Sequence, residues 1–213
     1  SLVTNKGKAL LVLGPSAAGK TMTTAKALET VIEDNNWNEG LNDNERLSFF
    51  MVDGGLIRET SHTYCRIKEA IRISAAETMK DVVGASDLYD AVKHGQSEYK
   101  NALLAELMKT KQNLLFLDTT ASFTMTRQHG GPFIAKTNKV LEELVRHKYE
   151  VSILMIYADR STCQDNGAGR DVREGKKYSD SAWGLSVSNA LDIFHYWGKD
   201  QRSLGASMHY VLD

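Results

Sequence analysis

The chain has 213 residues, which is enough for one domain with a full hydrophobic core. Hydrophobic residues make up 42% and charged residues 25%, as in ordinary soluble proteins, and the formal net charge of -1 gives no reason to expect a nucleic acid or a membrane as partner. The only cysteines are Cys65 and Cys163, no Cys/His cluster has zinc-ligand spacing, and neither a signal peptide nor a membrane-spanning run is found. We therefore expect a cytoplasmic protein without a structural metal.

The first buried strand, predicted over residues 9–13, leads directly into a complete phosphate-loop motif, G-x-x-x-x-G-K-[ST]. Its two glycines, Gly14 and Gly19, let successive backbone N–H groups turn toward phosphate oxygens. Lys20 supplies a positive charge for the β- and γ-phosphates, and the Thr21 hydroxyl is placed to ligate Mg²⁺. The sequence therefore predicts an ATP and Mg²⁺ site contacted by Gly14, Pro15, Ser16, Ala17, Ala18, Gly19, Lys20, Thr21 and Met22. A glycine-rich turn that binds nothing is the alternative, but it would not require the Lys-Thr pair.

Apolar residues recur with helical or strand spacing along the rest of the chain. A helix is predicted over 20–33 and a polar loop over 34–44, followed by a second buried strand over 47–53. The later elements, in chain order, are helical stretches over 64–80 and 87–111, a strand over 113–118, a helix around 140–145, a strand over 151–157, a charged segment over 159–180, a helix around 187–194 and a strand over 208–212.

Short apolar strands that alternate with helices indicate an α/β fold of the doubly wound class. We expect a P-loop NTPase fold of the kinase-like type: one domain over 1–213, a five-stranded parallel sheet with helices on both faces, and a lid at about 159–180. In such folds the ligand site lies at the carboxyl ends of the strands. Gly14, Asp53 and Asp118 all fall there.

Two strand-end carboxylates are candidates for chemistry. Asp118 ends a run of four apolar residues, a pattern typical of an acid that holds Mg²⁺ directly or through water; the alternative is an Asp that caps the next turn. Asp53 would accept the proton of an acceptor hydroxyl during phosphoryl transfer; a turn-forming Asp before two glycines is the other reading. Both alternatives stay open.

The segment from Arg160 to Lys177 is rich in basic residues and glycines. Phosphoryl transfer spreads negative charge over oxygens, so an arginine-bearing lid after the fourth strand is expected of a small-molecule kinase. We assign this role to Arg170 or Arg173, against the alternative of a solvated charged surface. Trp183, by contrast, is expected in the core.

With these elements in order, the chain resembles the zeta-toxin-like branch of the P-loop kinases from about Ala9 to Asp213. The similarity is carried by the phosphate loop, by Asn113-Leu114-Leu115-Phe116-Leu117-Asp118-Thr119-Thr120, by the stretch from Thr137 to Ile153 and by Gly169-Arg170-Asp171-Val172. The resemblance implies an ATP-dependent kinase of a small hydroxyl compound, which in the toxins is a UDP-linked amino sugar. Lys20 and Thr21 would then handle the phosphates and Mg²⁺, Asp118 would match the acid after the third strand, and Arg170 a lid arginine.

One departure from this family is Gly55, which stands where the family's second strand usually carries the catalytic base in D-x-D. Either Asp53 takes over, or the acceptor differs, or only nucleotide binding and slow hydrolysis remain. A nucleoside or nucleotide kinase, and a nucleotide-binding regulatory module with weak ATPase activity, are therefore the alternatives to a small-molecule kinase. The acceptor could be a nucleotide sugar or a nucleoside, and nothing in the sequence supports an antitoxin partner.

Overall fold

The structure is a computed structural model that describes residues 2–4, 6–42, 45–78, 98–117, 125–126, 134–135, 139–168, 170, 178–198 and 207–212. Residues 98–109 are helical. The other elements are β1 (Leu2–Thr4), β2 (Lys8–Leu13), α1 (Lys20–Asp34), β3 (Glu45–Leu47), β4 (Phe49–Asp53), α2 (Gly54–Glu59), α3 (His62–Thr78), β5 (Asn113–Leu117), β6 (Met125–Thr126), β7 (Ile134–Ala135), α5 (Lys139–Arg146), β8 (Glu150–Tyr157), α6 (Arg160–Gly167), α8 (Asp180–Gly198) and β9 (Ser207–Leu212).

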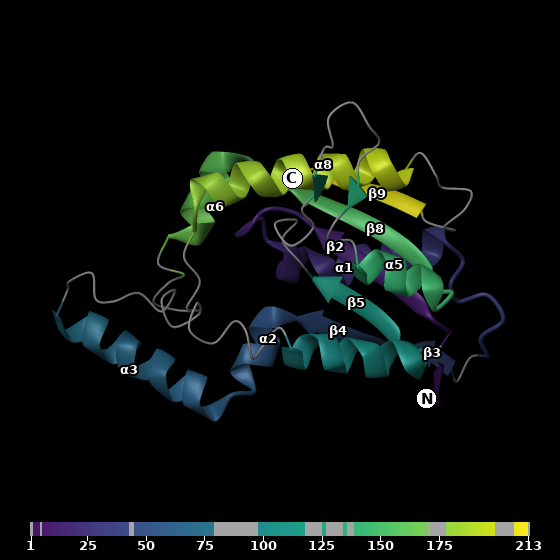
Figure 1. Cartoon of the computed structure of the whole chain (residues 1–213), viewed down its shortest axis with the longest axis horizontal. Helices are drawn as coiled ribbons and strands as arrows, with labels where there is room; N and C mark the ends of the chain where they lie inside the picture. The colour runs from purple at the N-terminus through teal and green to yellow at the C-terminus, as the bar shows by residue number, and fades with distance from the viewer. Residues whose placement is uncertain are drawn as a thin grey trace.

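The main sheet is parallel and has the strand order β4-β5-β2-β8-β9 (Figure 1). β2 lies between β5 and β8, with Ala9 opposite Leu114 on one side and Val151 on the other. Residues 9–13 are fully buried. A continuous apolar run is the expected composition of a parallel strand that is covered on both faces, and this is why the sequence reveals β2 so clearly.

Helices cover both faces of this sheet. Alternate residues of β2 enter two separate cores. Leu11 packs in the core that contains Leu107 of the 98–109 helix and Leu144 of α5. Leu10 packs in the core that contains Val31 of α1 and, from α6, the buried side chain of Cys163. The predicted parallel sheet covered by helices on both faces is thus confirmed.

The prediction of one buried strand over 47–53 was wrong in its start and in its burial. Leu47 belongs to β3, which pairs with β1 in a separate two-stranded sheet, and β4 begins only at Phe49. β4 stands at one end of the strand order, with only β5 as its neighbour, and Phe50 is 45% exposed. An apolar run looks the same in sequence whether it forms a central or an edge strand, because the difference is set by what packs on it.

The side chain of Asn113 ties the start of β5 to its neighbours. Its Oδ1 accepts hydrogen bonds from the backbone N–H groups of Lys6 and Lys8, at 3.0 and 3.1 Å. Its Nδ2 donates to the Ser48 carbonyl at 3.2 Å. These bonds fix the relative register of β2, β4 and β5, whose carboxyl ends carry the candidate site.

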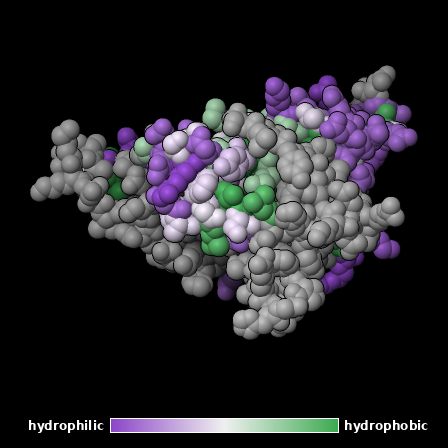
Figure 2. Space-filling model, turned by 90° about the horizontal axis from the view of Figure 1, so that it is seen from above, coloured by the Kyte–Doolittle hydropathy of each residue, from purple (hydrophilic) through white to green (hydrophobic). Residues whose placement is uncertain are grey.

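None of the helices in the described ranges is long and apolar enough to cross a membrane. Figure 2 shows the molecule from the side of α8, where a small hydrophobic area lies among hydrophilic side chains. Leu185 and Leu191 of α8 are about half exposed. Scattered apolar side chains of this kind are normal on a protein surface.

Candidate functional site

The loop between β2 and α1 has the sharp backbone turns that the phosphate-loop motif predicts. Gly14, Ala17 and Gly19 all have positive φ angles, of 149°, 67° and 77°. The Ala18 N–H donates to the Pro15 carbonyl at 3.3 Å, which closes a turn, and Gly19 is the N-cap of α1. The loop therefore delivers the positive end of the α1 dipole to the carboxyl edge of the sheet, where an anion would be stabilised.

Gly14 has a steric requirement as well as a conformational one. A Cβ on this residue would lie 2.1 Å from the carbonyl oxygen of Ile156 in β8. The loop thus leaves β2 in direct contact with the backbone of the neighbouring strand.

We expect Gly14→Ala to destabilise the fold by at least about 3 kcal/mol, because the clash is with backbone that cannot rotate away. Gly40→Ala is the matched control, since Gly40 also has a positive φ of 74° but has nothing within 4 Å of its Cβ position. The control should cost only about 1 kcal/mol. Urea unfolding of both variants measures the difference; equal costs would mean that β8 yields to the new methyl group.

Lys20 lies across the phosphate loop. Its Nζ donates to the carbonyls of Gly14 and Pro15, at 2.8 and 2.7 Å. The ammonium group is therefore held at the place where the motif predicts phosphate charge. The next residue, Thr21, is exposed in the first turn of α1, and the Met22 side chain is 90% exposed.

Asp53 ends β4 and caps α2. Its Oδ1 accepts a hydrogen bond from the Gly55 N–H at 2.5 Å. The turn-forming role that the sequence left open is thus present, and Gly55 lies in the first turn of α2. A carboxylate that accepts one N–H retains further lone pairs, so capping does not prevent it from accepting a proton.

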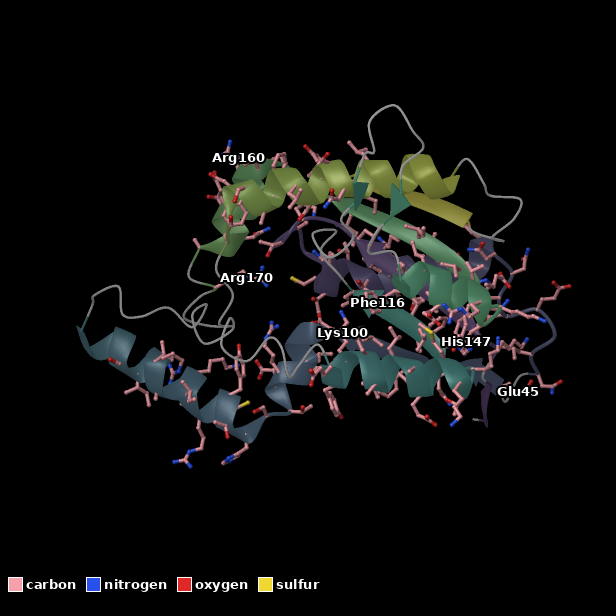
Figure 3. The ribbon with its side chains drawn as sticks, in the orientation of Figure 1. Glu45, Lys100, Phe116, His147, Arg160 and Arg170 are labelled. Atoms are coloured by element: carbon pink, nitrogen blue, oxygen red, sulfur yellow. The ribbon has the colours of Figure 1, made fainter. Side chains whose placement is uncertain are left out.

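Two cationic side chains that the sequence did not predict as site residues lie near the carboxyl ends of the strands. Arg58 of α2 is buried, with 6% of its surface exposed, and its Nη1 lies 3.9 Å from the Cβ position of Gly54. Lys100 places its Nζ 4.4 Å from the ring centroid of Phe116, near the end of β5 (Figure 3). No sequence motif marks either residue, because only the folded chain brings them toward the strand ends.

The end of α6 and the residues after it contact the phosphate loop. The Nδ2 of Asn166 donates to the Ala17 carbonyl at 3.1 Å. Arg170 Nη1 donates to Ser16 Oγ at 3.4 Å. The structure therefore brings the predicted Arg170 to the loop, whereas Asp118 and Arg173 lie outside the described residues.

Arg160, at the start of the predicted lid segment, has a different partner. Its guanidinium forms two hydrogen bonds to the Asp180 carboxylate, at 3.0 and 2.5 Å, at the far end of α6 from Arg170 (Figure 3). Residues 160–167 of that segment are the helix α6. Trp183, which was expected in the core, is partly buried; it packs against the core that contains Leu10 and donates to the Ala158 carbonyl at 3.2 Å.

The hydrogen bonds from Arg160, with a further one from Gln164, lower the pKa of Asp180 to about 2. Since this folded pKa lies below the unfolded pKa of about 3.9, the carboxylate stabilises the fold fully above about pH 4, and this stabilisation is lost as the pH falls toward 2.

Asp180→Asn should remove this acid-dependent part of the melting temperature and lower Tm at pH 7 by less than about 3 °C, since Arg160 and Asp180 are both exposed. Melting curves from pH 7 to pH 2, with the exposed Asp165→Asn as control, test this. An acid response shared by both variants and the parent would contradict it.

Comparisons with known proteins bear on the fold. No family model matches the chain, and a search of curated proteins finds no match. Among solved structures, the chain is similar to one from the PezAT chromosomal toxin–antitoxin system of Streptococcus pneumoniae, with 16% identity, a TM-score of 0.58, and coverage of 98% of this chain and 69% of that one. The chain has a P-loop kinase-like fold. A second structure, Chaetomium thermophilum Kti12 in complex with ADP-AlF3, matches with 12% identity, a TM-score of 0.39, and coverage of 96% and 88%.

Proposed function

We propose that the chain is an ATP-dependent kinase that transfers the γ-phosphate of ATP to a hydroxyl group of a small molecule, in the manner of the zeta-toxin-like kinases. The observation that carries this proposal is the convergence of two cations on the phosphate loop from different parts of the chain. Lys20 reaches it from α1 and Arg170 reaches it from beyond α6. A cytoplasmic location is part of the same proposal.

In this proposal the nucleotide phosphates replace the loop carbonyls as partners of Lys20. The N–H groups at the start of α1 bind the phosphates from one side. Arg170, and Arg173 by prediction, neutralise the charge that develops on the transferred group. The loop and its cations thus position the phosphoryl group and lower the energy of the transition state.

Mg²⁺ fits the oxygen chemistry of this edge. It is usually held by one or two protein oxygens together with the substrate phosphates. Within the described ranges, no group of three or more His, Cys, Asp and Glu side chains could hold a metal ion. The exposed Thr21 hydroxyl and the predicted acid Asp118 would hold the ion, which supplies charge neutralisation to the phosphates when bound.

The acceptor hydroxyl is proposed to approach between Asp53 and the helices of residues 60–110, with Asp53 as the general base. The carboxylate lies at the carboxyl end of β4, beside β5, which separates it from β2 in the sheet. A proton taken there leaves the hydroxyl oxygen free to attack the γ-phosphate.

A second candidate is a nucleotide-binding regulatory module with slow ATPase activity. It is favoured by the hydrogen bond between Asp53 and Gly55, because this carboxylate already has a structural role. This candidate predicts tight ATP binding, slow release of phosphate, and no labelled small molecule.

An acceptor screen with γ-labelled ATP separates these functions. The wild-type chain is incubated with Mg²⁺ and panels of nucleotide sugars, nucleosides and nucleotides, with Lys20→Ala as the negative control. Label in a nucleotide sugar supports the proposal, whereas label in a nucleoside or nucleotide favours the nucleoside or nucleotide kinase. Labelled inorganic phosphate alone, with no labelled acceptor in any panel, would overturn the proposal in favour of the regulatory module. This screen measures phosphoryl transfer and is independent of whether the chain binds an antitoxin.

A further inference from the structure

Ala17 has an unusual conformation for its residue type. It is the only residue other than glycine in the loop of residues 14–19 with a positive φ, at 67°. L-residues with a Cβ rarely adopt this region, and they persist there only where the surroundings hold them. The Ala17 side chain packs against the core that contains Leu10 and Val31. Its carbonyl accepts a hydrogen bond from Asn166, which is 149 residues away in the chain.

Asn166 is presented by a firmly packed helix. At the start of α6, the Asp159 side chain accepts the Thr162 N–H at 2.7 Å. In its middle, Cys163 is fully buried against the core. At its end, Gly167 packs so closely on Tyr178 that a Cβ would lie 2.6 Å from the Tyr178 Cβ. Asn166 therefore approaches the loop from a fixed direction.

The hydrogen bond acts on the peptide that closes the loop. The Ala17 carbonyl and the Ala18 N–H belong to one planar peptide group, so fixing the carbonyl also fixes the direction of the N–H. That N–H donates to the Pro15 carbonyl at 3.3 Å and closes the turn over residues 15–18. Asn166 thus holds the turn from outside the loop.

We propose that Asn166 is a positioning residue, which keeps Ala17 in its left-handed conformation and so preorganises the phosphate loop before a nucleotide arrives. This inference rests on the proposed function only in that the loop binds a nucleotide, and it does not depend on the acceptor. A preorganised loop binds more tightly, because less conformational freedom is lost on binding.

The test uses Asn166→Ala, Ala17→Gly, the double variant, and Asp165→Ala as the matched control on the same exposed turn of α6. We expect Asn166→Ala to accelerate amide hydrogen exchange in residues 14–21 of the free chain. It should weaken Mg·ATP binding by about 3- to 10-fold, as expected for one hydrogen bond, with an unchanged Tm. In the Ala17→Gly background the same change should have a much smaller effect, because glycine adopts a φ of 67° without a Cβ penalty.

Two results would overturn the inference. Asn166→Ala could match Asp165→Ala in both exchange and affinity, or it could cost the same with and without Ala17→Gly. Hydrogen exchange is measured without nucleotide, so it tests the role of Asn166 even if the wild-type chain transfers no phosphate. A failure of the proposed function would instead show as absent transfer or absent ATP binding in the wild-type chain, with the exchange difference intact.

Discussion

Lys20→Ala is expected to abolish phosphoryl transfer and to weaken ATP binding by at least about 100-fold. The ammonium group of Lys20 lies within 2.8 Å of the loop carbonyls, so a nucleotide that enters the loop meets its charge directly. Without Lys20, the β- and γ-phosphates lose the one positively charged side chain that belongs to the phosphate-loop motif. The loss should be large in binding and complete, within detection, in transfer.

Calorimetric titration with Mg·ATP measures this effect, together with a melting curve to show that the fold is intact. Lys26→Ala is the matched control, because Lys26 is an exposed lysine on the same helix. It should bind ATP like the wild-type chain. Full ATP affinity in Lys20→Ala would contradict the assignment of residues 14–21 as a phosphate loop.

Asp53→Asn is expected to reduce transfer by about 10²- to 10⁴-fold while ATP affinity changes little, as for loss of a general base. The substitution separates the two roles of this residue. Asparagine caps helices about as well as aspartate, so its side-chain oxygen can still accept the Gly55 N–H. It cannot accept a proton from the acceptor hydroxyl at neutral pH.

Asp53→Ala completes the comparison, because it removes the cap as well as the base. It should lose transfer to the same extent and in addition cost about 1 kcal/mol of unfolding free energy. Rates of label transfer and urea midpoints give the two readouts. If Asp53→Asn transfers phosphate at the wild-type rate, the base lies elsewhere and Asp53 is only a helix cap.

The parts of this fold that were predictable from sequence are those set by local pattern. The buried run before Gly14, the helix after Lys20 and the apolar strand ending at Leu117 each have a single plausible structure. The break between β3 and β4 was missed, because Leu47 and Phe49 belong to one apolar stretch that two different sheets share. Pairing partners of this kind are chosen by tertiary packing.

The phosphate loop was the part of the candidate site most directly predictable from sequence, because one motif spans it. Lys20 and its loop are contiguous in sequence, so their contacts follow from the motif. The contact of Asn166 with Ala17 joins residues on different elements, and a lone asparagine carries no pattern. Arg58 and Lys100 were missed for the same reason. The roles of Asp118, Arg173 and the lid at 159–180 stay predictions.

The most direct test of the kinase assignment is transfer of label from γ-labelled ATP to a small hydroxyl compound, measured side by side for the wild-type chain, Lys20→Ala and Asp53→Asn. The account predicts a labelled acceptor with the wild-type chain, none with Lys20→Ala, and at most about 1% of the wild-type rate with Asp53→Asn although it still binds ATP. Tight ATP binding by the wild-type chain with label released only as inorganic phosphate would contradict it.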